Sequence, residues 1–234
     1  MVAVKICGLS DRAGLDAAVA GGAEMIGLVF FPASPRAVTG ARAAALLAHA
    51  PGEGWPLRVG LFVDASDEEI AAVLDAAPLD LLQLHGEEGP ARCASLRARF
   101  GLPVMKALGI ATAADLALLD EYAPVVDRFL LDAKPAPGAA LPGGNAAAFD
   151  WSLLAGRAVP RPWLLAGGLT PENVAEAVRA TGAPGVDVSS GVEASRGVKD
   201  PARIAEFIRA ARGAAGTAAP AVAAGHARAA GRGG

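Results

Sequence analysis

The feature that most constrains this chain is an eightfold alternation of short apolar runs with stretches of helical periodicity. Each apolar run is rich in Leu, Val or Ile and ends in Gly, Asp or a turn-forming cluster. We expect strands at residues 2–7, 25–31, 57–63, 79–84, 103–108, 128–132, 163–166 and 185–189. We expect helices at residues 12–20, 41–50, 68–77, 91–100, 113–121, 151–156, 171–180 and 201–211. This alternation predicts parallel strands joined by helical crossovers.

The predicted strands are almost continuously apolar, which is the pattern of parallel strands covered on both faces. Eight β/α units close into a barrel more readily than they extend an open sheet. We therefore predict an α/β fold, a (β/α)8 TIM barrel that forms a single domain over residues 1–212 of the 234 in the chain. Residues 213–234 are dominated by Gly and Ala, and we predict a low-complexity, disordered C-terminal tail there.

Local signals mark some of the helix ends. Asp67 can cap the helix expected to begin at residue 68, and Thr170 can cap one that begins at Pro171. Gly101 and Gly182 fit the positions just after helix C termini, where a left-handed residue is common.

Composition argues against several classes of partner. The chain has 21 Lys and Arg against 24 Asp and Glu, a formal charge of −3, so it lacks the basic footprint of a nucleic-acid-binding protein. No apolar run is long enough to span a bilayer, so we expect no membrane partner. Neither Cys7 nor Cys93 belongs to a Cys/His cluster of the kind that binds zinc. The N terminus lacks a signal-peptide pattern, which favours a cytoplasmic protein with reduced thiols.

The candidate functional residues of this chain cluster at the C-terminal ends of the predicted strands. Active sites of eight-stranded α/β barrels form at these ends, where the loops between strands and helices meet. The candidates are Cys7, Arg36, His85, Asp132, Gly167, Gly168, Ser189, Ser190 and Gly191.

Glycine-rich turns follow both the seventh and the eighth strands, where barrels often bind a phosphate. Backbone N–H groups in such turns approach an anion without a Cβ in the way. Either turn alone is more often simple turn chemistry, whereas the two together indicate a phosphate site. We therefore predict a small phosphorylated molecule as the substrate.

Cys7 lies at the mouth of the predicted barrel, where a thiolate can remove a proton from a bound substrate. A cysteine at an arbitrary position is more often a small core residue, and Cys93, in the middle of a predicted helix, fits that description. Strand alternation places Lys5 on the face of Cys7, and Asp187 on the face of Ser189. Because the eighth strand closes against the first, we predict a Lys5–Asp187 pair beneath Cys7 that tunes the thiol. In the alternative, either charge turns to solvent or pairs elsewhere.

Three further residues have both a functional and a structural interpretation. Asp132, at the end of a Leu-rich strand, can hold a proton as a general acid or organise the following loop. Arg36 can hold a substrate carboxylate in a bidentate pair or be a solvated surface charge. His85 can orient a ligand or hydrogen-bond a neighbouring loop. We expect the sixth strand opposite the first, which places Asp132 and Cys7 on either side of a substrate.

A set of short motifs at or near the strand ends is highly specific when taken together. The motifs are Lys5-Ile6-Cys7-Gly8, Phe31-Pro32 with Ser34 and Arg36, Gln83-Leu84-His85-Gly86, Leu131-Asp132, Phe149-Asp150-Trp151, Ala166-Gly167-Gly168-Leu169 and Asp187-Val188-Ser189-Ser190-Gly191-Val192-Glu193. In these motifs the chain resembles the phosphoribosylanthranilate isomerase family, over residues 2 to about 212.

The resemblance implies an isomerase of tryptophan biosynthesis that uses no cofactor. The implied reaction is the Amadori rearrangement of N-(5-phosphoribosyl)anthranilate to 1-(2-carboxyphenylamino)-1-deoxyribulose 5-phosphate. By this resemblance Asp132 protonates the ribose ring oxygen, Cys7 removes the proton from the sugar C2, and Arg36 binds the anthranilate carboxylate. The turns receive the phosphate, with His85, Asp187 and Ser189 completing the substrate site. The oligomeric state stays open between monomer and homodimer.

One segment departs from the family pattern. Residues 134–148, directly after the sixth strand, contain three prolines and three glycines, and a loop of this length often acts as a lid. The family commonly has a Gly-rich run before Phe149, whereas this chain has Ala146. Because Ala adopts positive φ less readily than Gly, we expect that loop closure or turnover can differ.

Two other functions compete with this interpretation. One is another phosphate-binding barrel, such as indoleglycerol-phosphate synthase, whose lysine and glutamate constellation has no counterpart here. The other is a non-catalytic barrel that only binds a sugar phosphate, and the change at Ala146 alone favours it.

Overall fold

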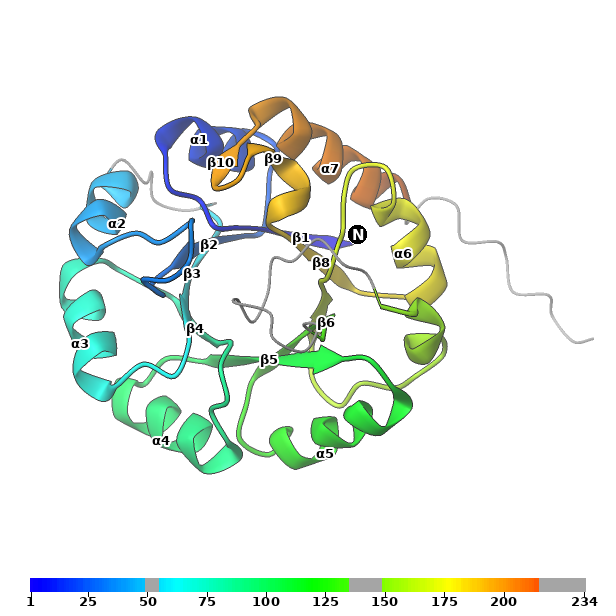
Figure 1. Cartoon of the computed structure of the whole chain (residues 1–234), viewed down its shortest axis with the longest axis horizontal. Coiled ribbons are helices and arrows are strands. Elements are labelled where there is room, and N and C mark those ends of the chain that lie inside the picture. Colours follow the sequence, from blue (N-terminus) through cyan, green and yellow to red (C-terminus); the bar gives the residue numbers. More distant parts are fainter. Residues whose placement is uncertain (49–54, 135–148, 215–234) are drawn as a thin grey trace, which may run out of the picture.

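A closed barrel of parallel strands, paired in the order β1 to β8, forms the centre of the molecule (Figure 1). A computed structural model describes residues 1–48, 55–134 and 149–214, and every structural statement below concerns these residues. The strands are β1 (Ala3–Cys7), β2 (Met25–Val29), β3 (Leu57–Phe62), β4 (Leu81–Leu84), β5 (Val104–Ile110), β6 (Arg128–Ala133), β7 (Trp163–Leu165) and β8 (Gly185–Val188). The predicted (β/α)8 TIM barrel is therefore confirmed.

Helices follow the strands and surround the barrel (Figure 1). The α-helices are α1 (Arg12–Ala20), α2 (Gly40–Leu47), α3 (Asp67–Ala76), α4 (Pro90–Phe100), α5 (Leu118–Tyr122), α6 (Val174–Thr181) and α7 (Pro201–Ala214). The 3-10 helices are η1 (Ala113–Ala117), η2 (Trp151–Leu154) and η3 (Ser190–Val192). Among the described residues, no helix has the length and apolar character needed to cross a membrane.

The crossovers after β6 and β8 differ from the prediction. The helix expected at residues 151–156 is only the 3-10 turn η2. After β8, η3 leads into a short antiparallel hairpin of β9 (Glu193–Ser195) and β10 (Val198–Lys199), which the sequence did not predict. This hairpin lies beside α1 and α7 at one end of the barrel (Figure 1).

The apolar side chains of the strands form two layers. Those on the outer face, such as Val4 and Ile6, pack against the surrounding helices. Those on the inner face fill the lumen in a separate cluster that includes Val59, Leu81 and Leu130. Burial on both faces explains why the strands are almost continuously apolar, since each buried Leu or Val contributes about 1.5–3 kcal/mol. The filled lumen leaves the functional site at the end of the barrel.

Helix termini confirm some capping predictions and correct another. Gly101 and Gly182 end α4 and α6 in the left-handed conformation, with φ of 65° and 68°. Asp67 does not cap α3 but is its first helical residue. The cap is Ser66, whose side chain accepts from the backbone of Glu69 while the Glu69 carboxylate accepts from the backbone of Ser66.

The ends of the last two helices also differ from prediction. Asn173 rather than Thr170 occupies the N-cap of α6, which begins at Val174, and its side chain makes no capping bond. Its Oδ1 accepts instead from the Thr170 N–H at 2.8 Å. Helix α7 continues to the buried Ala214, so the predicted start of the tail at 213 falls inside the helix. The rest of that predicted tail lies outside the described residues, as do the predicted lid at 135–148 and its Ala146.

Candidate active site

The strand ends bring Cys7, His85 and Asp132 to one end of the barrel. Cys7 is the last residue of β1, Asp132 lies one residue before the end of β6, and His85 directly follows β4. In the closed strand order, β6 lies three positions from β1 through β8 and β7, and β5 is the strand directly opposite β1. The expectation that β6 lies opposite β1 was therefore wrong by one strand, although Asp132 and Cys7 still flank the same mouth.

The predicted Lys5–Asp187 pair is present beneath Cys7. Lys5 on β1 is in register with Asp187 on β8, and Lys5 Nζ lies 2.7 Å from Asp187 Oδ1. The Lys5 side chain is 0% exposed, so two opposite charges are held away from water. Although burial alone would lower the pKa of Lys5, the charge and hydrogen bond of Asp187 raise it above its ordinary value, so the residue stays protonated.

Opposing effects set the pKa of the buried Cys7 thiol. Burial is the largest effect and raises the pKa, because a thiolate loses its hydration there. The positive charge of Lys5 lowers the pKa, as does that of Lys199 more weakly, whereas Asp187 raises it. The net result is a pKa above the ordinary thiol value, so two cations stabilise a thiolate that burial makes scarce.

Gly27 on β2 makes room for this arrangement. It is in register with Cys7, and a Cβ at Gly27 would lie 2.8 Å from Cys7 Sγ and 3.1 Å from Lys5 Nζ. Real Cβ contacts are essentially never shorter than 3.0 Å, so any side chain here would displace the thiol or the lysine. The sequence gives no hint of this role, since Gly27 is simply a small residue in an apolar strand.

Asp132 has His85 as a neighbour. His85 Nε2 lies 3.4 Å from Asp132 Oδ2, while Asp132 Oδ1 accepts from the Ala133 N–H at 2.8 Å. On its other side, His85 Nδ1 lies 3.0 Å from Nε2 of the buried Gln83. The Gln83 amide thus fixes the ring through Nδ1, and Nε2 is the nitrogen that faces Asp132. The structure thus joins Asp132 and His85, and adds Gln83, to which sequence analysis gave no role.

Arg36 is buried, which overturns the interpretation of a solvated surface charge. Its Nε donates to Glu193 Oε1 at 2.6 Å and its Nη2 donates to Glu193 Oε2 at 3.0 Å. The bidentate edge that we expected to bind a substrate carboxylate is therefore occupied by a carboxylate of the protein. A guanidinium has five N–H donors, so the end formed by Nη1 and the second Nη2 proton remains for another acceptor.

The turns after β7 and β8 lie together at this end of the barrel. Gly167 and Gly168 have φ of 88° and 61°, a region that other residues adopt at a cost. A Cβ at Gly191 would lie 1.9 Å from the carbonyl oxygen of Leu169, so the two turns are in direct backbone contact there. Lys199 on β10 donates to the carbonyl oxygen of Ser189 at 2.8 Å, which fixes the start of the second turn.

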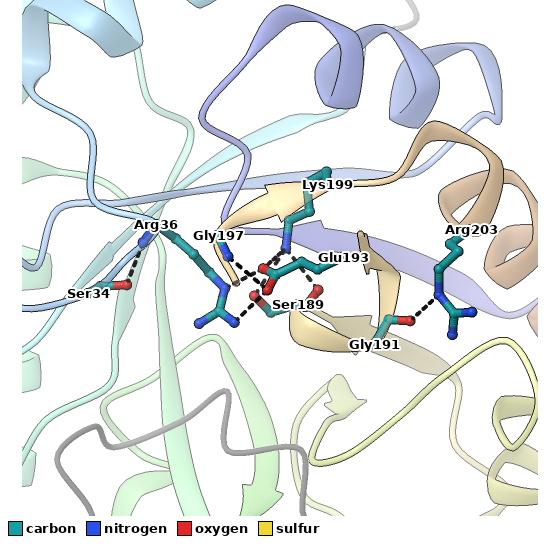
Figure 2. A network of polar contacts seen from close by, with 8 residues as sticks. All are labelled: Ser34, Arg36, Ser189, Gly191, Glu193, Gly197, Lys199 and Arg203. Carbon is teal, nitrogen blue, oxygen red and sulfur yellow. Dashed lines mark hydrogen bonds and ion pairs between the residues drawn. The ribbon is translucent and has the colours of Figure 1, made fainter. Parts of the chain in front are cut away.

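Two charged residues of this region were missed by sequence analysis. Glu193 was part of a quoted motif but was given no role, and Lys199 was not considered. Both lie on the hairpin of β9 and β10, and Figure 2 shows their side chains converging on Arg36 and Ser189. A lysine and a glutamate six residues apart around a Gly-containing turn carry no signal that their side chains are buried.

The closed barrel, with a thiol and a carboxyl group at the ends of its strands, defines the class of protein: a (β/α)8 barrel with the architecture of a barrel enzyme. Residues 4–210 match the family model of N-(5'phosphoribosyl)anthranilate (PRA) isomerase. The chain belongs to this family, and it is an isomerase of tryptophan biosynthesis that converts N-(5'-phosphoribosyl)anthranilate to 1-(o-carboxyphenylamino)-1-deoxyribulose 5-phosphate. The two competing functions, indoleglycerol-phosphate synthesis and non-catalytic binding, are thereby set aside.

Relatives agree along nearly the whole length of the family domain. The N-(5'-phosphoribosyl)anthranilate isomerase of Rhodospirillum rubrum is 59% identical over 211 residues, which cover 89% of this chain and 97% of the relative. The crystal structure of the Thermotoga maritima isomerase is 36% identical, with a TM-score of 0.81 over 91% of this chain and 100% of that chain. Another solved isomerase, 35% identical with a TM-score of 0.76 over 91% and 100% of the two chains, is in complex with reduced 1-(o-carboxyphenylamino)-1-deoxyribulose 5-phosphate.

Proposed function

We propose that Cys7 is the general base of the isomerisation and that Asp132 is the general acid. The observation that carries the proposal is the environment of Cys7, a buried thiol whose pKa Lys5 and Lys199 both lower. A buried cation beside a cysteine is not by itself the mark of a base, since Lys106 also lies near Cys93. Cys7 differs because it ends β1 at the mouth of the barrel, where a barrel enzyme binds its substrate, so the lysine charges there act on a thiol placed for catalysis.

The proposed steps transfer only protons between the protein and the substrate. Asp132 donates its proton to the ribose ring oxygen, and the bond between that oxygen and C1 breaks to leave an open-chain iminium group. Cys7 then takes the proton from C2, and the electron pair of that C–H bond forms the C1–C2 double bond of an enolamine. Tautomerisation of the enolamine to the ketone completes the isomerisation.

The raised pKa of Cys7 determines how much of the enzyme carries the thiolate that acts as base. Near neutral pH the resting group is the thiol, and the thiolate that acts as base is a minority. The fraction of thiolate increases as the pH rises toward that pKa, and kcat/KM increases with it as long as Asp132 keeps the proton that it donates. Residues that stabilise the thiolate, Lys5 above all, therefore contribute directly to the rate.

His85 is proposed to orient Asp132. Its Nε2 faces Asp132 Oδ2 at 3.4 Å, and Gln83 fixes the ring from the other side. With one carboxyl oxygen facing the ring and the other accepting from the Ala133 N–H, the carboxyl plane of Asp132 is held in one orientation. A fixed orientation suits a group that must deliver a proton to one ring oxygen.

The two anionic groups of the substrate are proposed to bind at separate places. The free end of the Arg36 guanidinium receives the anthranilate carboxylate. The phosphate binds in the adjoining turns, with Asp187 and Ser189 completing the substrate site. These turns are formed by Gly167, Gly168, Ser190 and Gly191. A solved relative is in complex with reduced 1-(o-carboxyphenylamino)-1-deoxyribulose 5-phosphate, a ligand that carries both anionic groups.

The remaining proposals concern the protein as a whole. We propose that residues 1–214, through the end of α7, act as a single catalytic domain in the cytoplasm, where Cys7 stays reduced; both cysteines are free thiols in the structure. The protein acts as a monomer or a homodimer, and the dimeric state described for the Thermotoga maritima isomerase favours the second possibility.

A fluorescence assay tests the acid and base directly. Turnover removes the anthranilate-type fluorescence of freshly prepared substrate, and Cys7→Ala and Asp132→Asn should each slow it by at least about 100-fold. Matched controls are Cys93→Ala, a buried cysteine on α4, and Asp120→Asn, an exposed aspartate on α5, both expected to keep parental rates. Full activity in Cys7→Ala or Asp132→Asn would refute the role of that residue alone.

A further inference from the structure

In the hairpin of β9 and β10, an apolar side chain is exposed while charged side chains are buried. Val198 is 50% exposed, whereas its charged neighbour Lys199 is only 4% exposed. The Glu193 side chain, opposite Lys199 in the hairpin, is also buried. Placing an apolar residue outside and two charges inside is unfavourable for a hairpin that serves only as a connection.

The buried carboxylate of Glu193 is fully used. Its Oε1 accepts from Arg36 Nε at 2.6 Å and from Lys199 Nζ at 2.9 Å. Its Oε2 accepts from Arg36 Nη2 at 3.0 Å and from the Gly197 N–H at 3.0 Å. Burial would raise the pKa of Glu193, but these donors hold it below the ordinary value, so the carboxylate stays charged.

The ammonium group of Lys199 is used as completely. Besides its bond to Glu193, it donates to the carbonyl oxygen of Ser189 at 2.8 Å and to Ser189 Oγ at 3.3 Å. These three acceptors match the three N–H donors of an ammonium group. Lys199 therefore ties the Glu193 carboxylate to the residue that begins the proposed phosphate turn, as Figure 2 shows.

Within this network, Arg36 keeps N–H donors that Glu193 does not use. Two of its five N–H groups are bound by Glu193, which leaves the end of the guanidinium. The side chain lies next to the strand that carries the base, because a Cβ at Gly8, the residue after Cys7, would be 2.6 Å from Arg36 Cδ. Arg36, Lys199 and Glu193 together carry one net positive charge, which suits a ligand with two anionic groups.

The geometry points to Glu193 and Lys199 as positioning residues that align the two anion-binding parts of the site. Glu193 holds one edge of Arg36, so that the opposite end faces the substrate carboxylate with its torsions fixed. Lys199 holds Ser189 and thereby the phosphate turn. This inference rests on the proposed function, since it takes Arg36 as the receptor of the carboxylate.

Two ligands that differ in one carboxylate distinguish a positioning role of Glu193 and Lys199 from a general effect on the stability of the site. One is reduced 1-(o-carboxyphenylamino)-1-deoxyribulose 5-phosphate, and the other is the same compound with phenyl in place of carboxyphenyl. Calorimetric titration of both gives the ratio of their Kd values, which measures the benefit of the carboxylate. For the parent protein we expect a ratio of about 10 to 100, the benefit of a charge-assisted hydrogen-bonded pair.

The variants should affect this ratio differently. Glu193→Gln should lower it about tenfold, while the Kd of the phenyl compound stays within about threefold of the parent, because Arg36 alone loses its alignment. Lys199→Met should weaken both ligands by a similar factor of about tenfold through the phosphate turn. The control Glu206→Gln, an exposed glutamate on α7, should change neither Kd.

The outcomes distinguish this inference from the proposed function. An equal loss of affinity for both ligands in Glu193→Gln, or no loss, would overturn the positioning role. Arg36 would still be the receptor of the carboxylate if Arg36→Met lowers the ratio of the two Kd values to about 1. An unchanged ratio in Arg36→Met would refute the carboxylate assignment and the positioning role together. Should Glu193→Gln fail to fold, Glu193→Asp keeps the charge, and an unaltered ratio with the shorter side chain would also refute the role.

Discussion

Two of the buried lysine–carboxylate pairs in the described residues, one on β1 and β8 and one near β4 and β5, each have a cysteine beside them. Lys5 Nζ is 2.7 Å from Asp187 Oδ1, and Lys106 Nζ is 2.7 Å from Glu88 Oε2. The thiol pKa of Cys7, next to the first pair, and that of Cys93, next to the second, are both raised by burial and lowered by the neighbouring lysine. In distance, burial and charge the two clusters are almost the same.

They differ in what else the charged groups bind. Lys106 also donates to the carbonyl oxygen of Gly86 at 2.6 Å, and Glu88 accepts from the backbone N–H groups of Asp64 and Gly86 at 2.8 and 2.9 Å. The second pair thus ties together the loops after β3 and β4. Burial raises the pKa of Cys93 to about 11, and the Cys93 Sγ faces the backbone carbonyl of Glu88 at 3.7 Å.

The lysine charge of the first pair acts on a thiol instead. Among the described residues, Lys5 has Asp187 as its oxygen acceptor, and its charge and a hydrogen bond act on Cys7 at the barrel mouth. The comparison teaches that a buried ion pair reveals its role through its further partners. Backbone partners indicate a loop-organising pair, whereas a titratable group at the end of a strand indicates a catalytic one.

The largest expected effect is a difference in activity between variants of Lys5 and Lys106. Lys5→Met and Lys106→Met each leave a buried carboxylate unpaired, which should cost about 3–5 kcal/mol of stability in both variants. At neutral pH, Lys5→Met should also lower kcat/KM by about 100-fold, because the thiolate of Cys7 loses its main cation. Lys106→Met should stay within about tenfold of the parent. Thermal unfolding and the fluorescence assay measure the two effects side by side.

The double variant Lys5→Met/Asp187→Leu removes both charges of the first pair and should recover most of the lost stability without recovering activity. Activity that returns together with stability would show that Lys5 acts only through the fold, as Lys106 does. The comparison between the two pairs would then fail.

A smaller effect concerns the space around the first thiol. Gly27→Ala places a methyl group 2.8 Å from Cys7 Sγ, so the thiol must move and kcat should fall by about tenfold with KM little changed. Gly89→Ala is the matched control near the second pair, because a Cβ there would meet nothing within 4 Å. Equal kinetics of both alanine variants would mean that the thiol position in the structure is irrelevant to catalysis.

The sequence predicted those parts of the molecule that follow from periodicity. Strand alternation places Lys5 and Cys7 on one face, and barrel closure brings β8 beside β1, so the pairing of Lys5 with Asp187 follows from the residue pattern alone. Cys7, His85 and Asp132 were identified in the same way, because strand ends in a barrel share one rim.

Residues beyond the strand ends could not be placed by such rules. Arg36 lies in an irregular segment and Glu193 in the short strand β9, 157 positions away, so their ion pair has no sequence period that would reveal it. Lys199 belongs to a two-residue strand whose inward face is set by its charged partners rather than by an apolar pattern. The start of α6 also differs from the prediction: the helix begins at Val174, and Thr170 donates its N–H to the Asn173 side chain.

The central claim, that a buried and cation-stabilised Cys7 is the base, is tested most directly by comparing two titrations. One is the thiolate absorbance of the parent minus that of Cys7→Ala, and the other is the pH dependence of kcat/KM. Because the thiolate of Cys7 and the protonated form of Asp132 are both required, the pH profile of kcat/KM should change slope at the midpoint of the thiolate titration, which burial raises. Both midpoints should move upward together in Lys5→Met. A kinetic midpoint that stays in place while the thiolate titration moves would contradict the account.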